Sequence, residues 1–316
     1  MRIVLCYPVN ESHVSQIQAS APDAEIVNAG QERIDELLPT ADIFIGHAKV
    51  PVDWDRVLAA KKLRWIQSSA AGLDHCLVPG VVHSDILVSS ASGLFAPQVA
   101  EQTFAILFGL LRKLPLFFRA EAKREFIRLP TDDLRGKTVG IVGLGGNGRA
   151  IARVLAPWDV RIVATDYYPV DQPEEVAELW PADQLDQLLE VSDIVILALP
   201  LYERTEGLFD TSRIAKMRPG SLLINVARGA VVVESALVDA LAAGHLAHNI
   251  DIMHTAIHNR RHGLHQLLKG VPGYPMALLV EVHPHYKRFA QGARQVDKFF
   301  PRWVYAQYVA DYNFFI

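Results

Sequence analysis

Short hydrophobic runs recur along the chain and alternate with stretches in which apolar residues repeat at helical spacing. The runs are rich in Val, Ile and Leu and show little polar alternation, which is typical of strands buried on both faces of a parallel sheet. Helices between such strands produce repeated β–α–β units, so the pattern favours an α/β fold over an antiparallel α+β fold. The predicted strands are 3–7, 25–28, 42–46, 63–68, 86–90, 138–143, 161–166, 193–199, 221–227, 249–253 and 276–282.

The predicted strands fall into two groups, one before about residue 92 and one after about residue 137, which predicts two sheets. Between the groups, residues 97–114 repeat apolar side chains on one helical face and predict a helix. The polar stretch 119–136 is typical of a connector. A length of 316 residues fits two domains, since domains commonly hold roughly 150 residues each.

Composition excludes several classes of protein. Half of the residues are hydrophobic and 21% are charged, which is enough apolar material for a sizeable core. The net charge of −4 gives no basic excess for nucleic acid or an anionic membrane. Two cysteines, Cys6 and Cys76, cannot form a disulfide framework, and no apolar run approaches the length of a membrane span. We therefore expect a soluble, cytoplasmic protein.

A glycine pattern marks a candidate dinucleotide site. Gly143, Gly145 and Gly148 form G-x-G-x-x-G between a predicted strand and a helical stretch over 146–155. The first glycine permits a tight turn, the second allows a pyrophosphate to approach the backbone, and the third allows close helix–strand packing. Asp166 ends the next predicted strand, where its carboxylate would bind the adenosine ribose hydroxyls and repel a 2′-phosphate. The pattern therefore favours NAD over NADP.

Further short motifs lie before and after the glycine pattern along the chain. They are SSAAGLD at 68–74, Gly93 with VAE at 99–101, LRGKTVGIVGLG at 134–145, ALP at 198–200 with Thr205, MRPG at 217–220 and INVARG at 224–229. Together they make the chain resemble the D-isomer-specific 2-hydroxyacid dehydrogenases, in particular the glyoxylate and hydroxypyruvate reductases. The likeness is good over residues 60–245, whereas the C-terminal part is divergent.

The resemblance implies two Rossmann-like, doubly wound parallel-sheet domains with an interdomain cleft. Residues 1–97 together with 286–316 would form a flavodoxin-like substrate domain, and residues 98–285 would form the NAD-binding domain. The implied activity is hydride transfer between the nicotinamide of NAD and a small D-2-hydroxy acid or 2-keto acid. The family resemblance further implies a homodimer and no metal.

Family motifs also assign candidate residues. The loop Ala71, Gly72 and Leu73 resembles the one that binds the substrate carboxylate through backbone N–H groups. Arg228 follows a predicted strand and carries a permanent, planar charge suited to gripping a carboxylate or polarising a ketone oxygen. The expected cofactor-binding residues are Gly143, Gly145, Gly146, Asn147, Gly148, Asp166, Leu199, Pro200, Thr205, Ala227, Arg228 and Asp251.

The expected acid/base is a histidine, because its pKa lies near working pH. Relatives carry it in a Pro-His pair after the last strand of the cofactor domain, which favours His285, with His283 as the competitor. The partner glutamate of the family is missing, because Ala256 stands five residues after Asp251. Without a neighbouring carboxylate the pKa of this histidine is expected to stay near the ordinary imidazole value. Ketone reduction would then be favoured at lower pH.

Three alternatives stay open at this point. His254, His258 and His262 would share one face of a helix and suit a metal, although the nearby glycine and proline residues favour a loop. The missing glutamate also fits a non-catalytic NAD(H)-binding protein. Formate oxidation is the third alternative, because a hydride leaves formate without removal of a proton from oxygen.

Overall fold

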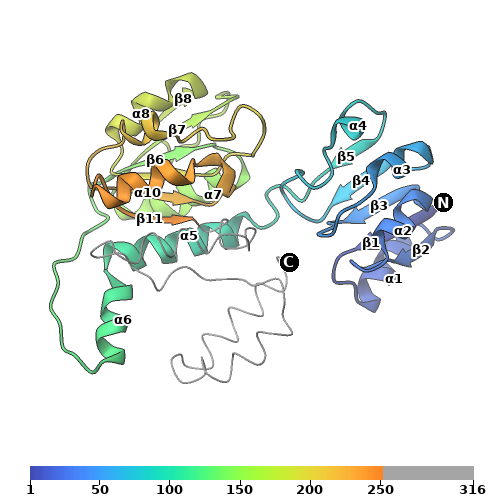
Figure 1. Ribbon diagram of the computed structural model, residues 1–316, viewed down its shortest axis with the longest axis horizontal. Coiled ribbons are helices and arrows are strands. Elements are labelled where there is room, and N and C mark those ends of the chain that lie inside the picture. Colours follow the sequence, from blue (N-terminus) through green and yellow to red (C-terminus); the bar gives the residue numbers. More distant parts are fainter. Residues whose placement is uncertain (252–316) are drawn as a thin grey trace. The chain divides into compact units, whose positions relative to one another are not determined.

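All strand pairings in the part of the chain that the structure describes are parallel. The structure is a computed structural model and describes residues 1–251 (Figure 1). These residues belong to two compact units, which we call unit 1 (Met1–Phe95) and unit 2 (from Ala96 onward). Each unit holds one parallel sheet, as the hydrophobic runs predict.

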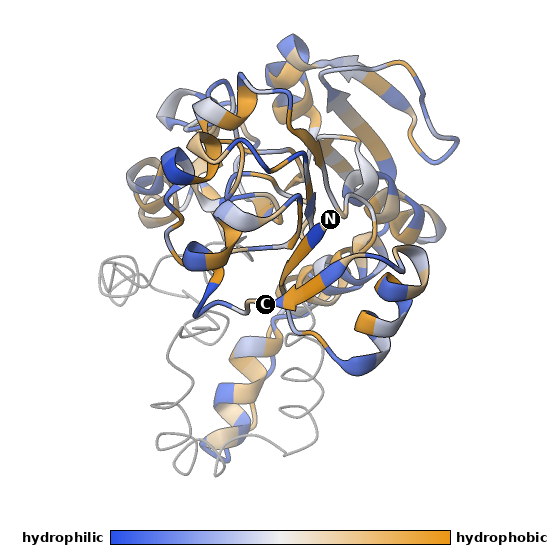
Figure 2. Ribbon diagram, turned by 90° about the vertical axis from the view of Figure 1, so that its right-hand side faces the viewer, coloured by the Kyte–Doolittle hydropathy of each residue, from blue (hydrophilic) through white to orange (hydrophobic). Residues whose placement is uncertain are grey.

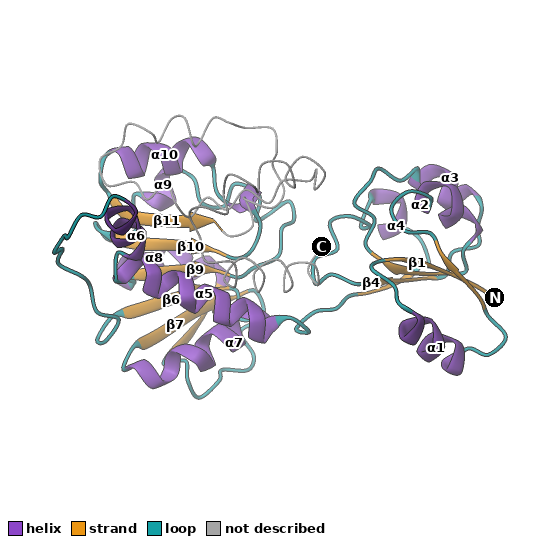
Figure 3. Cartoon of the chain, turned by 90° about the horizontal axis from the view of Figure 1, so that it is seen from below, coloured by secondary structure: helices purple, strands orange, loops and turns teal. Residues whose placement is uncertain are grey.

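Unit 1 contains a five-stranded sheet in the order β2-β1-β3-β4-β5, which is the flavodoxin-like order. Helix α1 packs against one face through Ile17, while α2, α3 and α4 cover the other face (Figure 3). The elements are β1 (Arg2–Cys6), α1 (Glu11–Ser20), β2 (Glu25–Asn28), α2 (Ile34–Leu37), β3 (Ile43–Gly46), α3 (Trp54–Ala59), β4 (Trp65–Ser68), α4 (Pro79–Val82) and β5 (Leu87–Ser89).

Unit 2 contains a six-stranded sheet in the order β11-β10-β9-β6-β7-β8, the strand order of a Rossmann domain. Helices lie on both faces of this sheet (Figure 3). Its elements are α5 (Ala96–Leu111), α6 (Leu114–Ala122), β6 (Thr138–Val142), α7 (Gly146–Leu155), β7 (Arg161–Asp166), β8 (Glu178–Pro181), α8 (Leu185–Val191), β9 (Ile194–Leu197), α9 (Thr211–Ile214), β10 (Ser221–Asn225), α10 (Glu234–Ala242) and β11 (Leu246–Asp251).

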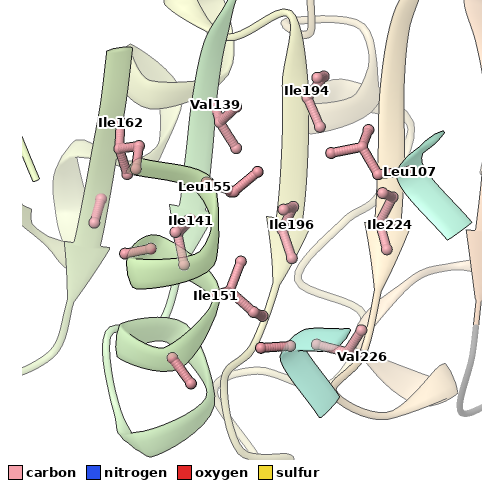
Figure 4. Close-up of a cluster of buried hydrophobic side chains, with 14 of the residues drawn as sticks. Leu107, Val139, Ile141, Ile151, Leu155, Ile162, Ile194, Ile196, Ile224 and Val226 are labelled. Carbon is pink, nitrogen blue, oxygen red and sulfur yellow. The ribbon is translucent and has the colours of Figure 1, made fainter. Parts of the chain in front are cut away.

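The strands of unit 2 place alternate side chains in two cores. Ile141, Ile196 and Ile224 point to the face covered by α5 and α7, where they pack with Leu107 and Ile151 (Figure 4). Their neighbours along each strand enter the second core, beneath α8 and α10. Each fully buried aliphatic side chain contributes roughly 1.5–3 kcal/mol, so the central strands anchor both helix layers. Hydrophobic residues accordingly concentrate on the strands (Figure 2).

Ten of the predicted strands are confirmed, with ends shifted by up to three residues. The strand β8 is missed because it is a half-exposed edge strand that ends in Pro181. The prediction of a connector from residue 119 is wrong in its first part, because α6 runs to Ala122. A left-handed Lys113 also divides the single helix predicted over 97–114 into α5 and the start of α6. The strand predicted at 276–282 lies outside the described residues.

The helices of the described residues are all too short or too polar to cross a membrane. The two cysteines, Cys6 and Cys76, are buried and unpaired with each other. Burial raises the pKa of each thiol to about 11, so neither is a thiolate nucleophile at neutral pH.

One backbone contact in unit 1 supports a stability prediction. Gly46 has a φ of 145°, and a Cβ built on it would lie 2.3 Å from the carbonyl oxygen of Cys6. We expect Gly46→Ala to lower the free energy of unfolding by about 2 kcal/mol, measured by urea denaturation. Gly109→Ala in α5 is the control, because it meets no atom within 4 Å and is expected to stabilise by about 0.5–1 kcal/mol. Equal urea midpoints for Gly46→Ala and the wild type would contradict this account.

Candidate functional site

The carboxyl ends of β6 and β9 define the point where the strand order of unit 2 reverses direction. Helical connections leave neighbouring strands toward opposite faces there, which opens the position where α/β sheets bind ligands. The loops that follow these two strands lie against each other. A Cβ on Gly143 would stand 2.9 Å from backbone atoms of both Ala198 and Leu199. The structure thus brings together the predicted glycine loop and the predicted segment Leu199–Pro200.

The three glycines of the loop meet different constraints. Gly143 has a φ of 95°, a conformation that side chains disfavour, and its N–H donates to the carbonyl of Thr165 over 2.8 Å. A Cβ on Gly148 would lie 2.1 Å from the carbonyl oxygen of Gly143, so only glycine lets α7 pack this closely on β6. Gly145, in contrast, faces open space, with no atom within 4 Å of a built Cβ. Open space at this glycine is what a bound pyrophosphate requires.

Helix α7 directs its N-terminus at the same point. Gly145 is its N-cap residue, and no side chain caps the N–H groups of the first turn, which contains Gly146, Asn147 and Gly148. These N–H groups and the positive end of the helix dipole suit a diphosphate. Arg149 stabilises the glycine loop, because its Nε donates to the carbonyl of Leu144 over 3.0 Å. No motif in the sequence marked this arginine.

Asp166 ends β7 beside the glycine loop. One carboxylate oxygen accepts the N–H of Leu144 over 2.7 Å, and the other accepts the N–H of Tyr168 over 2.9 Å. These bonds fix the carboxylate and leave further lone pairs for hydroxyl donors, because each oxygen accepts about two hydrogen bonds. The position and the charge fit the ribose of NAD and disfavour a 2′-phosphate.

The loop after β9 is shaped by Thr205, a buried residue. Its hydroxyl donates to the carbonyl of Pro200 over 2.7 Å and accepts the N–H of Tyr202 over 2.9 Å. The side chain therefore closes the turn that carries Leu199 and Pro200. This places Thr205 as a support for the predicted cofactor loop.

Arg228 follows β10 at the same edge of the sheet, with a half-buried side chain. Its guanidinium donates to the carbonyl of Ala227 over 3.0 Å. The buried amide of Asn225 accepts the N–H of Ala227 over 2.9 Å and donates to the carbonyl of Arg228 over 2.9 Å. Asn225 thus sets the backbone that presents Arg228. In the sequence, Asn225 stands out as a polar residue at the end of an otherwise apolar strand.

Of the remaining candidates of unit 2, only Asp251 lies among the described residues. Asp251 ends β11, and its backbone pairs in register with Asn225, so this position lies at the same edge as Arg228. His283, His285 and Ala256 lie outside the described residues. The same holds for the histidines 254, 258 and 262, which were weighed as metal ligands.

The predicted carboxylate loop belongs to unit 1 and follows β4. The N–H of Ala70 donates to the buried hydroxyl of Ser68 over 3.0 Å, and the carbonyl of Leu73 accepts the N–H of Cys76 over 3.0 Å. Within residues 1–251, the N–H groups of Ala71, Gly72 and Leu73 donate to no protein acceptor. Three successive backbone donors of this kind suit a carboxylate.

Comparison with known proteins agrees with this geometry. The family model "D-isomer specific 2-hydroxyacid dehydrogenase, NAD binding domain" matches residues 104–271. A D-3-phosphoglycerate dehydrogenase of Mycobacterium bovis is 32% identical over 222 residues, which cover 69% of this chain and 42% of the relative. The chain therefore spans less than half the length of that curated relative.

Two solved structures extend the likeness to most of the chain. A D-isomer specific 2-hydroxyacid dehydrogenase family protein from Aeromonas salmonicida has a TM-score of 0.71 at 26% identity, with 86% of each chain covered. The NAD-dependent formate dehydrogenase from Staphylococcus aureus, in complex with NAD, has a TM-score of 0.66 at 26% identity, covering 80% of this chain and 81% of that one.

The open space at Gly145 allows a test of cofactor binding that leaves the fold intact. We expect Gly145→Ala to weaken NADH binding by about tenfold or more, because a methyl group enters the space of the pyrophosphate. Since no atom lies within 4 Å of that methyl, the melting temperature should stay close to the wild-type value. NADH fluorescence titration and thermal unfolding measure the two effects. Unchanged NADH affinity in a folded Gly145→Ala variant would count against this cofactor site.

Proposed function

The chain belongs to the D-isomer specific 2-hydroxyacid dehydrogenase family, and we propose that it is an NAD-dependent oxidoreductase of small D-2-hydroxy acids and 2-keto acids. The observation that carries the proposal is the set of groups at one edge of the unit 2 sheet. The uncapped N-terminus of α7, the fixed carboxylate of Asp166 and the guanidinium of Arg228 all follow strands that end there.

The described residues fit the cofactor. The N–H groups of the first turn of α7 would hold the pyrophosphate, Asp166 the adenosine ribose, and the segments around Pro200 and Ala227 the remainder. When bound, the nicotinamide supplies the chemistry of hydride donation and acceptance. The chain's task is to orient the acid, to polarise its carbonyl and to move one proton.

Two of these tasks have candidates among the described residues. The backbone donors of Ala71, Gly72 and Leu73 would grip the substrate carboxylate, and the Arg228 guanidinium would polarise the 2-keto oxygen. Because guanidinium stays charged at every working pH, Arg228 stabilises developing negative charge on that oxygen without itself transferring a proton. Proton transfer therefore requires another group, for which we propose His285.

The missing glutamate gives the non-catalytic alternative a specific cause. Ala256 stands where relatives carry the histidine's partner, so a chain that binds NADH without turnover is the second candidate function. Formate oxidation needs no proton removed from oxygen, and one structural relative is a formate dehydrogenase. We keep it as a third candidate, supported by that likeness.

Exposed aromatic side chains support a homodimer. Phe118 on α6 is 61% exposed, and Phe126 beyond it is 86% exposed. In Figure 1, α6 extends away from the sheet of unit 2. A second copy that covers this apolar helix would remove it from water, as in an isologous interface. We also propose a reducing compartment, the cytoplasm, which is supported by the presence of only two cysteines, both free.

Turnover tests the proposed activity. Wild-type protein should oxidise NADH with at least one member of a panel of 2-keto acids, and Arg228→Gln should lower kcat/KM by about 100-fold or more while NADH still binds. Arg153→Gln, an exposed arginine on α7, is the matched control and should keep its rate. Folded protein that binds NADH yet reduces no keto acid and oxidises no formate would establish the non-catalytic alternative.

The acid/base proposal predicts a pH dependence. Reduction needs a protonated histidine, so kcat/KM should be higher at about pH 5.5 than at about pH 7.5, falling about tenfold per unit above the pKa of that histidine. His285→Ala should abolish this dependence together with most of the rate, and His283→Ala should not. A rate that stays flat between the two pH values would show that no histidine titrates in the rate-determining step.

The homodimer is tested by light scattering coupled to size exclusion. We expect the wild type to have the mass of two chains and Phe118→Glu to shift toward one chain, because a buried unpaired charge costs several kcal/mol at an interface. Val170→Glu, at a position 87% exposed in unit 2, is the control and should leave the mass unchanged. Wild-type protein with the mass of a single chain would overturn the dimer.

A further inference from the structure

We propose that Arg149 is a positioning residue for the adenosine half of the cofactor, because it fastens the loop after β7 to the glycine loop. The inference rests on the proposed function, since it concerns how the NAD site of that reaction is built. The loop in question comprises residues 167–171, and we call it the adenosine loop. Arg149 would act through the two loops and not on the reacting atoms.

The guanidinium of Arg149, near the start of α7, divides its donors between two segments of the chain. Its Nε donates to the carbonyl of Leu144 over 3.0 Å, and its Nη2 donates to the carbonyl of Asp171 over 2.7 Å. Its Nη1 also lies 3.2 Å from a carboxylate oxygen of Asp171. A guanidinium holds its donors in a rigid planar fork, so this one side chain fixes the distance between the two carbonyls.

A second bridge joins the same two segments. The Asp166 carboxylate accepts the N–H of Leu144 over 2.7 Å and the N–H of Tyr168 over 2.9 Å. Both backbone polar groups of Leu144 are therefore linked to the adenosine loop, each through one side chain. Asp166 fastens the beginning of that loop, and Arg149 fastens its end.

The adenosine loop depends on such bonds because its own side chains are exposed. Tyr168 is 74% exposed and Val170 is 87% exposed, so little packing holds this part of the chain. The N–H of Val170 donates to the carbonyl of Tyr168 over 2.8 Å, which forms a bond within the loop. The hydroxyl of Tyr167 accepts a bond from Arg204 over 3.2 Å. Loss of Arg149 should therefore increase the motion of the end of the loop.

The adenosine end of the cofactor would lie where these bridges meet. Asp166, the proposed ribose partner, begins the adenosine loop, and Leu144 precedes Gly145, where the pyrophosphate would lie. A loop that is already ordered costs less entropy on binding than a mobile loop. The charge of Arg149 is paired with Asp171, so we expect its effect to come from geometry more than from attraction to the phosphates.

The test measures binding of ADP-ribose, which is the cofactor without its nicotinamide, by calorimetry on the full-length protein. We expect Arg149→Met to weaken binding by about tenfold, because two hydrogen bonds that order the loop are lost. Arg149→Lys should lose about as much, since an ammonium on a flexible stem cannot set the distance between two carbonyls.

Turnover supplies a second measurement. With NADH and a 2-keto acid, Arg149→Met should raise the KM for NADH by a similar factor and leave kcat within about twofold. This split is expected because the groups proposed for the chemical step follow other strands. A loss confined to kcat would overturn the proposal.

A double-mutant cycle tests whether Arg149 acts through the adenosine loop. Asp171→Ala removes the carboxylate partner and keeps the carbonyl, so it should weaken ADP-ribose binding by about threefold. In the Arg149→Met background the same change should have no further effect, because the bridge is already absent. Independent losses that multiply would overturn the bridge.

Arg153→Met is the matched control. Arg153 lies one turn further along α7, and its Nε donates to the carbonyl of Arg149 within the helix. This variant should bind ADP-ribose as the wild type does. If Arg149→Met does not fold, Asp171→Ala decides the question, because its side chain is 78% exposed, and unchanged affinity there would overturn the bridge.

The remaining outcomes separate this inference from the proposed function. Full ADP-ribose affinity in folded Arg149→Met or Arg149→Lys would overturn the positioning role while the proposed activity stands. A lower melting temperature of Arg149→Met with unchanged affinity would do the same, because it would identify a purely structural role. If the wild type binds neither ADP-ribose nor NADH, the proposed function itself fails and the positioning role fails with it.

Discussion

The approach of α7 to β6 is the contact on which the candidate cofactor site depends. At Gly148 the helix passes so close to the carbonyl of Gly143 that a side chain would overlap it, at 2.1 Å. This approach aims the helix N-terminus at the reversal point of the strand order. The Asp166 carboxylate accepts the N–H of Leu144, and Arg149 donates to the carbonyl of the same residue. Both backbone polar groups of Leu144 in the glycine loop are therefore fixed. A longer side chain at Gly148 would displace the helix and all of these groups together.

Unit 1 also brings two strand ends together at a glycine, but the side chains that follow its strands are different. Gly46 allows the ends of β3 and β1 to meet, as Gly143 does for β6 and β9. Both sheets are parallel, so all the loops that follow their strands gather at one edge. In unit 2 that edge presents backbone N–H groups, a carboxylate and a guanidinium. In unit 1 the loops that follow β3 and β4 carry the stacked imidazoles of His47 and His75. The sheet topology determines where ligands bind, and the loop residues determine which ligands those are.

Local sequence signals predicted what depends on neighbours along the chain. The apolar runs predicted the central strands, and the spacing of Gly143, Gly145 and Gly148 predicted the start of α7 at residue 146. Interactions between distant segments were not predictable. The stack of His47 on His75 joins the loops that follow two adjacent strands, and the bond from Arg149 to Leu144 depends on how α7 enters its first turn. The edge strand β8 escaped detection because half-exposed residues carry a weak hydrophobic pattern.

The proposed mechanism assigns binding and proton transfer to separate groups of the chain. Asn225 is buried and makes both of its described bonds to the backbone of Ala227 and Arg228, so the core of unit 2 fixes the backbone that carries this guanidinium. In the proposed mechanism, alanine at position 256 would remove the carboxylate partner that tunes the pKa of the acid/base histidine, whereas Arg228 and the N–H donors of α7 are retained in the sequence. Divergence at that position would therefore change the pH range of the proposed reaction before it changes the affinity for the cofactor.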